Sequence, residues 1–321
     1  MATPAAVIEP GSARVKPWLG ADEVARAITM VFAIAILGIA ALLVFELWTN
    51  SAPSRQKFGF GFLTSALWNP VTDQFGALPY IYGTIVTSTL AMLISVPLGV
   101  GAAIYLSELA TPRLSSALTF LVELLAAVPS VIFGLLAIFT LVPLMRSYIE
   151  PALKAAFGFL PLFTGPAYGF SYLAAGIILA VMTFPFIISV SREALLSVPR
   201  EQREAALALG ATKWESTWQV VVPFARLGIL GSVFLGLARA LGETMAVTMV
   251  IGNNPGIHAS LLALGYTMPS VIANEFAEAT GDVYKSALVE IGLVLFFLTI
   301  FINGMARILI LVTTRKGSGR A

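Results

Sequence analysis

Two charged residues, Arg239 and Glu243, stand four positions apart inside the otherwise apolar run Leu227–Ile251. An arginine at the centre of a membrane costs about 2.5–3.5 kcal/mol on insertion scales, so Arg239 is expected to face protein or water rather than lipid. Its guanidinium presents a planar fork of donors that fits carboxylate or phosphate oxygens. The two residues therefore predict either a path for an anion or a structural ion pair between two subunits, and their chemistry leaves both open.

A continuous helix over this run would place Arg239 at the thirteenth of 25 positions, near the middle of a membrane span. Side chains that are mostly small or polar would share its face, namely Gly228, Ser232, Gly236, Glu243, Ala246 and Val250. Such a face is expected to pack against another helix or to line a path. Because arginine before glutamate is the weaker order for an intrahelical pair, either group can instead reach a partner subunit.

A second group of residues lies in the polar loop that precedes this run. Its first half predicts a short helix over about 197–209, with Gly210 as a left-handed cap behind it. Its second half predicts a helix that starts at Thr212, where the threonine hydroxyl and the Glu215 carboxylate form a capping box, and that ends at Pro223. An ordered loop of this kind is expected to be a docking handle for a separate protein.

The residue inventory excludes several kinds of chemistry. The chain has no cysteine, which excludes disulfides, iron–sulfur clusters and thiol catalysis. Its one histidine, His258, has no nearby cysteine or carboxylate cluster and is expected to be structural or incidental rather than a metal ligand. No G-x-x-x-x-G-K-[ST] motif occurs, so any ATP is expected to be bound by a partner. Without a nucleophile–base or metal constellation, the chain is predicted not to be an enzyme.

The composition predicts an all-α membrane protein. The chain is 58% hydrophobic and only 11% charged, against about 25% charged residues in soluble domains. Six apolar runs reach the length of about 20 residues that a membrane-spanning helix needs, and they cover Ile28–Trp48, Ile81–Leu106, Ala117–Met145, Tyr172–Val190, Leu227–Ile251 and Ala287–Val312. The alternating polarity of a membrane β-barrel is absent.

Two features predict how these spans pack. Pro97, Pro129 and Pro185 lie inside the second, third and fourth runs, where a proline kinks a helix and neighbours must satisfy the freed carbonyl. Helix packing and a role in gating are both open for them. The second run also carries a stripe of small residues suited to close helix contact, which consists of Thr84, Ser88, Ala91, Ser95, Gly99 and Ala103.

The basic residues predict the topology. Thirteen lysines and arginines lie on the side of the termini and the polar loop, against five on the other side. This bias places both termini in the cytoplasm. The predicted organisation is a flexible cytoplasmic tail (1–20), a first transmembrane helix with an external loop (21–80), a permease core (81–312) with its cytoplasmic loop (191–226), and a second cytoplasmic tail (313–321).

The polar loop carries Glu204, Ala205, Ala206, Gly210 and Pro223 at a defined spacing. This spacing is similar to that of the EAA loop of bacterial ABC importer permeases, whose pattern is Glu-Ala-Ala, three residues, Gly, nine residues, then Ile-x-Leu-Pro. The sequence departs from the pattern with valine in place of both the isoleucine and the leucine. The resemblance implies that these five residues couple the chain to an ATPase.

Longer stretches resemble one family of such permeases. Ala127–Gly134, Thr183–Phe186 and above all Leu237–Val247 look like the PstC-type permeases of bacterial phosphate-specific transport systems. The resemblance covers about 81–312, and Met-Ala-Val after Gly-Glu-Thr favours PstC over its paralogue PstA. It implies the type I ABC importer fold, with six transmembrane helices, and a part in transport for Arg239 and Glu243.

The resemblance also implies a set of partners and a place in the cell. They are a PstA-type permease, a PstB-type ATPase dimer that uses ATP and Mg²⁺, and a PstS-type phosphate-binding protein, with no nucleic acid and with this chain binding no cofactor itself. The predicted function is the permease subunit of an ATP-driven phosphate importer in the bacterial inner membrane, surrounded by lipid. A permease for another oxyanion or small solute, and an autonomous secondary carrier or channel, are the alternatives.

Overall fold

The computed structural model of the chain describes residues 19–317, and the side chains of residues 22–308. The predicted tail 1–20 therefore falls almost wholly outside the described residues, as does the end of the tail 313–321. Within the described part the structure is helical, and its one β pairing is an isolated bridge between Asn69 and Gln74. Six helical segments are long and apolar enough to cross a membrane, which confirms the predicted fold class, and they cover Asp22–Asn50, Leu78–Leu109, Ser130–Phe157, Tyr172–Leu196, Lys213–Gly242 and Asp282–Ile308.

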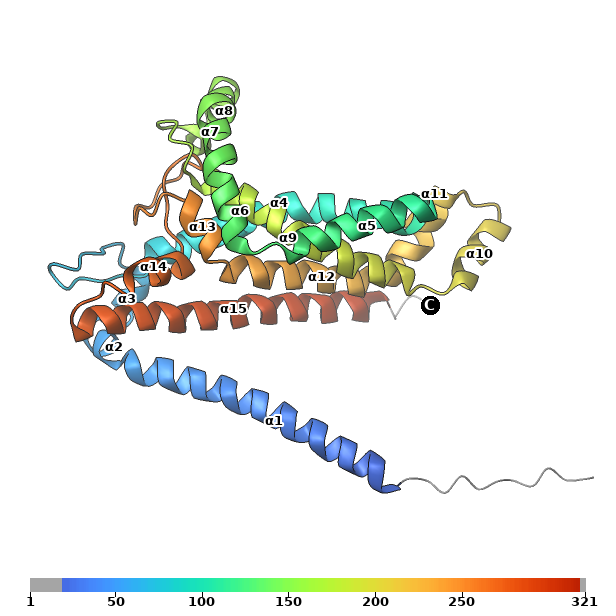
Figure 1. Ribbon diagram of the computed structural model, residues 1–321, viewed down its shortest axis with the longest axis horizontal. Helices are drawn as coiled ribbons and strands as arrows, with labels where there is room; N and C mark the ends of the chain where they lie inside the picture. The colour runs from blue at the N-terminus through green and yellow to red at the C-terminus, as the bar shows by residue number, and fades with distance from the viewer. Residues whose placement is uncertain (1–18, 318–321) are drawn as a thin grey trace, which may run out of the picture. The chain divides into compact units, whose positions relative to one another are not determined.

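Figure 1 shows the elements in chain order. The first part of the chain forms α1 (Leu19–Asn50), α2 (Ala52–Phe58), α3 (Gly61–Thr64), α4 (Leu78–Ile104) and the π-helical turn η1 (Tyr105–Leu109). The middle part forms α5 (Pro112–Ala127), α6 (Ser130–Leu136), η2 (Ala137–Leu141), α7 (Val142–Leu144), η3 (Met145–Ile149), α8 (Glu150–Phe157), η4 (Pro161–Phe163) and α9 (Tyr172–Leu196). The last part forms α10 (Arg200–Ala208), α11 (Lys213–Ser216), η5 (Thr217–Val221), α12 (Val222–Gly242), α13 (Met245–Val250), α14 (Met268–Glu275) and α15 (Asp282–Gly317).

By its internal contacts the chain divides into two units, residues 1–46 and residues 47–321. The described part of the first unit is most of α1, an apolar helix whose side chains are exposed on every side, Val31, Ile36 and Leu42 among them. A helix that is hydrophobic all round is stable only when other apolar matter covers it. An apolar environment, as a membrane supplies, must therefore cover α1.

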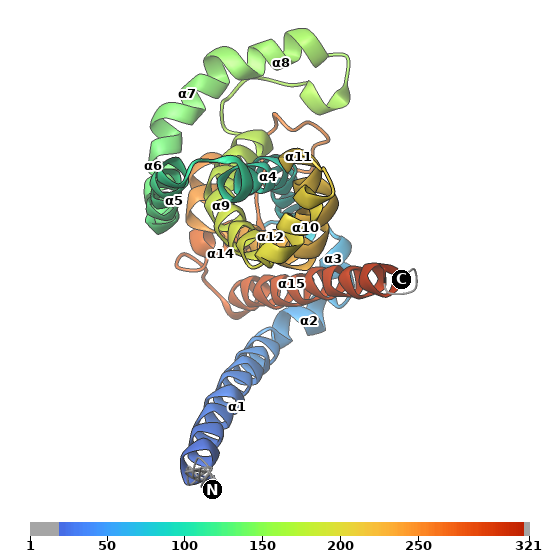
Figure 2. The same ribbon diagram turned by 90° about the vertical axis from the view of Figure 1, so that its right-hand side faces the viewer.

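The second unit is built around α4, α9 and α12, which lie side by side in both views (Figures 1 and 2). The predicted stripe of small residues on α4 makes this close packing possible, and all six of its residues are buried. Pro97 and Pro185 lie inside the continuous helices α4 and α9, as the sequence predicts. The serine hydroxyls of Ser191 on α9 and Ser232 on α12 hydrogen-bond each other at 2.6 Å, so the two helices are also joined by a buried polar contact.

The third predicted span, Ala117–Met145, is wrong, because the chain breaks at Pro129. Helix α5 ends at Ala127, and Val128 and Pro129 have extended backbone angles, with ψ 128° and 142°. A residue before proline avoids the helical region, and proline itself has no N–H for the helical ladder. A new helical segment, α6 to α8, follows and leaves the bundle, as Figure 1 shows.

The fifth predicted span, Leu227–Ile251, is also interrupted. Helix α12 ends at Gly242, Glu243 is extended with φ −71° and ψ 126°, and α13 begins at Met245. Glycine is a poor helix former, and a polar side chain that bonds the backbone nearby offers an alternative to the helical ladder. The predicted single face from Gly228 to Val250 therefore does not extend beyond Gly242.

An aromatic cluster joins the loop before α4 to the first turn of α15. Trp68 contacts the rings of Phe75 and Tyr80 edge-on, with centroids 4.8 and 4.9 Å apart. The Trp68 indole N–H and the Tyr284 hydroxyl both donate to one carboxylate oxygen of Glu275, at 2.8 and 2.6 Å. This carboxylate ties the loop before α4 to α14 and α15.

Candidate functional site

Arg239 lies in the last turn of α12, three residues before the helix ends at Gly242, and not in the middle of a continuous helix. Its guanidinium carbon lies 4.3 Å from the centroid of the Phe186 ring on α9. A cation over an aromatic face is attracted by the ring, and a cation in the last turn is favoured by the helix dipole. The ring and the helix end therefore stabilise the charge of this half-buried side chain.

Glu243 occupies the break between α12 and α13. One of its carboxylate oxygens accepts the backbone N–H of Ala246, at 3.4 Å, in the first turn of α13. Within the described part of the chain, Glu243 forms no ion pair with Arg239. An intrahelical pair, one of the possibilities that the sequence leaves open for these two residues, is therefore absent, because the helix that would align them ends at Gly242.

The two interrupted spans meet at their breaks. Helix α6, after the break at Pro129, packs on α13, after the break at Gly242. Gly134 on α6 permits this contact, because a Cβ there would lie 2.4 Å from the Met249 sulfur and 3.2 Å from the Ala246 Cα. Broken transmembrane helices are tolerated where the freed backbone groups are buried in protein or line a cavity. The region beside Arg239 and Glu243 is thus built from two half-helices.

The first half of the polar loop folds as α10, close to the predicted helix over 197–209. Gly210 has φ +88°, which confirms the left-handed cap. Its N–H donates to the carbonyl of Leu207, at 3.0 Å, and the N–H of Ala211 donates to that of Ala206, at 3.1 Å. These two bonds form a Schellman motif, in which glycine takes the left-handed position without steric cost.

The second half of the loop starts with the predicted capping box. The Thr212 hydroxyl accepts the N–H of Glu215 at 3.3 Å, and the Glu215 carboxylate accepts the N–H of Thr212 at 2.8 Å. Pro223 does not end this helix, contrary to expectation, because α11, η5 and α12 form one span from Lys213 to Gly242. The π-helical turn η5 lies just before Pro223, and a local π adjustment is one way in which a helix accommodates proline.

The EAA residues lie on the accessible surface of this loop. Glu204, Ala205 and Gly210 are exposed, Ala206 is half-buried, and Pro223 is exposed at the start of α12. No residue of α10 is buried. The geometry therefore leaves Glu204 and Ala205 free to contact another protein.

Arg203 and Glu108 form a two-bonded ion pair between α10 and η1 that the sequence does not predict. The break at Pro129 is not predicted either. A signal was present in each case: Glu108 is an acidic residue at the end of an apolar run, Arg203 directly precedes the Glu-Ala-Ala triplet, and Pro129 follows a β-branched valine. An acidic or basic residue at the end of an apolar run does not by itself predict a long-range contact. A proline after valine does not by itself distinguish a break from a kink.

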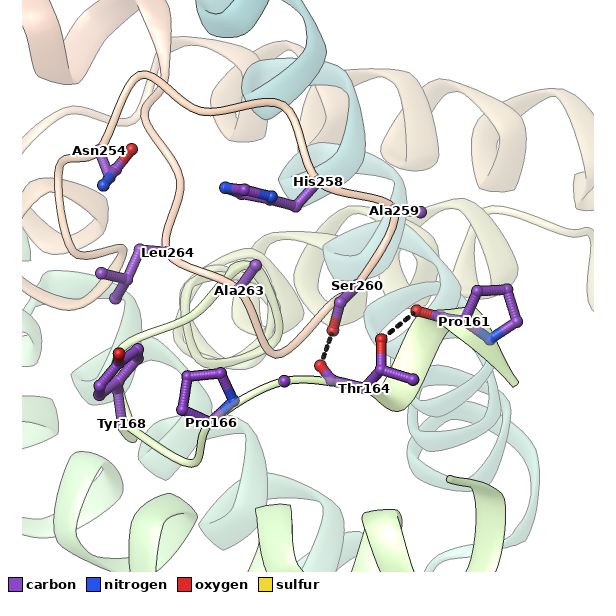
Figure 3. Close-up of a pocket in the computed structure, with 11 residues that line it drawn as sticks. Pro161, Thr164, Pro166, Tyr168, Asn254, His258, Ala259, Ser260, Ala263 and Leu264 are labelled. Carbon is purple, nitrogen blue, oxygen red and sulfur yellow. Dashed lines mark hydrogen bonds between the residues drawn. The ribbon is translucent and has the colours of Figure 1, made fainter. Parts of the chain in front are cut away.

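A cavity of about 470 Å³ lies between the α8–α9 and α13–α14 connections (Figure 3). The Ser260 hydroxyl donates to the carbonyl of Thr164 at 2.6 Å, and the Thr164 hydroxyl donates to that of Pro161 at 3.1 Å. Asn254 and His258 are exposed on its wall, which contains no carboxylate, lysine or arginine. Among the described residues no group of three histidines or acids that could hold a metal occurs. This wall therefore offers no charged group comparable to Arg239.

The fold is that of the membrane component of a transport system. Residues 95–311 match the family model described as "Binding-protein-dependent transport system inner membrane component". A crystal structure of a bacterial ABC transporter involved in the import of the acidic polysaccharide alginate has a chain with the same fold, at 17% identity and a TM-score of 0.54, covering 89% of this chain and 97% of that one. This class has the six-span importer fold that the resemblance implies.

Curated relatives narrow the class to one family. The chain is 44% identical over 311 residues to the phosphate transport system permease protein PstC of Mesorhizobium japonicum, with 95% of each chain covered. It is 44% identical over 293 residues to PstC of Xylella fastidiosa, with 90% of each covered. The chain belongs to the PstC family of phosphate transport system permease proteins.

Proposed function

We infer that this chain is the membrane-spanning permease subunit of an ATP-driven phosphate importer. The observation that carries the proposal is the 44% identity to a PstC protein over 95% of both chains. The chain has no P-loop motif, so ATP and Mg²⁺ are used by a partner ATPase. The permease itself is non-catalytic and binds no cofactor.

The partners are a paralogous PstA-type permease, a PstB-type ATPase dimer and a PstS-type phosphate-binding protein. The ATPase binds the EAA loop. Glu204, Ala205 and Ala206 form the binding surface, Gly210 caps the helix behind them, and Pro223 follows at the start of α12. The excess of basic residues on the loop side supports a cytoplasmic loop and cytoplasmic termini in a bacterial inner membrane. The permease core is 81–312.

Arg239 and Glu243 lie in the path of phosphate. Arg239 is half-buried near the break between two helices, and within the described chain no carboxylate neutralises it. Phe186 offers no hydrogen-bond acceptor, so the guanidinium donors are left for phosphate oxygens. Because the Phe186 ring, and not a carboxylate, stabilises the Arg239 charge, the guanidinium can attract an anion and release it again. The competing role for both residues is a tether to the paralogous permease.

Reconstitution in liposomes tests the proposal. The complete complex, with its partner permease, ATPase and binding protein, should take up phosphate only when ATP is supplied. Competing sulfate and molybdate should have little effect, and inhibition by either would instead identify another oxyanion as the substrate. Liposomes with this chain alone should take up nothing, because uptake there would identify an autonomous carrier.

A further inference from the structure

One arginine, Arg203, joins α10 to the ends of two spanning helices. Its Nε and Nη2 donate to the two carboxylate oxygens of Glu108, at 3.1 and 2.8 Å. The same guanidinium donates to the backbone carbonyls of Leu195, at 2.7 Å, and Val198. Glu108 belongs to η1, which continues α4, while Leu195 lies in the last turn of α9 and Val198 lies two residues beyond its end. Three elements thus meet at a single side chain.

Helix α10 packs on α11 and η5, the second half of the same loop, but it buries little surface. None of its residues is buried, and only Arg203 and Ala206 are half-buried. The Arg203 and Glu108 side chains are 20% and 10% exposed, so the pair is largely shielded from water. Exposed ion pairs contribute little, but a two-bonded arginine–carboxylate contact fixes both distance and orientation. The contact can therefore transmit a displacement of α10 to the spans.

The contact also leads toward the proposed substrate path. Helix α9, whose end Arg203 caps, carries Phe186, and the Phe186 ring contacts Arg239 on α12. Helices α9 and α4 pack along their length, and α9 packs on α12 as well. Rigid elements joined by hydrogen bonds are the kind of physical network through which distant sites couple. A continuous series of contacts therefore runs from α10 through α9 to Arg239 on α12.

We propose that Arg203 is a positioning residue that couples the EAA loop to the transmembrane path, by clamping α10 to Glu108 and to the end of α9. The proposal rests on the function proposed above. When the ATPase moves α10, the clamp moves the ends of α4 and α9 with it. Without the clamp, α10 shifts against the bundle and ATP is hydrolysed without transport.

The test uses the complete complex in liposomes and measures phosphate taken up per ATP hydrolysed. Arg203→Gln and Glu108→Gln should each lower this ratio by about fivefold or more, the lower range of allosteric coupling, with assembly and basal ATPase activity retained. Arg200→Gln is the matched control, because Arg200 lies on the same helix, is exposed, and its side chain forms no hydrogen bond or ion pair within the described chain. It should leave the ratio unchanged. An unchanged ratio in Arg203→Gln would overturn the proposal.

A second pair of variants keeps the test decisive if Arg203→Gln prevents assembly. Arg203→Glu alone places two carboxylates together and should uncouple strongly. Arg203→Glu with Glu108→Arg restores an opposite-charge contact between α10 and η1 and should recover part of the ratio. Glutamate at position 203 cannot donate to the Leu195 and Val198 carbonyls, so the reversed pair restores only the contact with position 108. A reversed pair that assembles yet couples no better than Arg203→Glu would contradict a role for that contact in the clamp. Failure of the proposed function itself would appear differently, as a wild-type complex that hydrolyses ATP and transports no phosphate.

Discussion

The guanidinium of Arg239 lies over the ring of Phe186, with its carbon 4.3 Å from the ring centroid, and forms no ion pair with Glu243. The position of this charge is therefore set by α9, the helix that carries Phe186. The same helix is held at its end by Arg203 through the carbonyl of Leu195. Any movement of α9 is expected to change where Arg239 presents its donors.

Phe186→Leu tests the role of the ring. Leucine keeps an apolar side chain but removes the aromatic face, and a cation–π contact contributes about 0.5–2 kcal/mol. Phosphate uptake should fall by about 2- to 30-fold, given that 1.36 kcal/mol corresponds to a factor of ten. Phe184→Leu, at a half-buried phenylalanine of the same span, is the control and should have little effect. Equal uptake in the two variants would show that the ring does not position Arg239.

Gly134→Leu tests the contact between the two half-helices. A side chain at Gly134 meets the Ala246 backbone at 3.2 Å, and overpacking of this kind costs about 1–3 kcal/mol. The complex in detergent should unfold at a lower temperature and transport poorly. Gly231→Leu is the control, because its Cβ would meet nothing within 4 Å. A Gly134→Leu complex as stable as the Gly231→Leu complex would mean that α6 and α13 do not need this close approach.

The sequence predicts helix caps in this protein better than it predicts whether a long helix is continuous or broken. The Schellman cap at Gly210 and the capping box at Thr212 follow from side chain and backbone preferences within a few residues, and both are present. The number of spans follows from hydropathy, and it is correct. Breaks are harder to predict, because a proline in an apolar run can kink a helix, as expected at Pro97, or end it, as at Pro129.

The sequence names candidate site residues, but it does not predict how their side chains lie relative to one another. Spacing alone placed Arg239 and Glu243 on one face, and the extended backbone at Glu243 separates them. The contacts of Arg239 with Phe186 and of Arg203 with Glu108 join residues far apart in the chain. Such contacts depend on the packing of whole helices, and no periodicity within one segment contains that information.

Gly210→Val should uncouple the loop. The position has φ +88°, and a left-handed conformation costs a residue with a Cβ about 1–2 kcal/mol. Space is not limiting, since a Cβ at Gly210 meets nothing within 4 Å. Gly210→Asn should be tolerated better than Gly210→Val, because asparagine is also found at left-handed helix caps. Copurification of the ATPase with each variant, together with phosphate uptake, measures the effect. Normal assembly and uptake in Gly210→Val would remove the loop from the coupling mechanism.

The topology can be tested with single cysteines, because the chain has none of its own. Gln202 on α10 and Ala259 on the cavity wall are exposed and make no side-chain hydrogen bond in the described chain. In intact cells a membrane-impermeant thiol reagent should label Ala259→Cys and spare Gln202→Cys, as the excess of basic residues on the loop side predicts. Opening the cells should make Gln202→Cys reactive. The reverse labelling would invert the proposed orientation.

Phosphate uptake by the reconstituted complex with Arg239→Gln is the most direct test of the account. Glutamine keeps much of the bulk but loses the charge and the donor fork, so uptake should be abolished while assembly and binding-protein docking persist. Adding Glu243→Gln should not restore uptake, because the two side chains form no ion pair. We expect the loss of uptake to persist in a well-assembled double variant. Recovery of uptake in that variant would contradict this expectation and would identify the two residues as a structural tether.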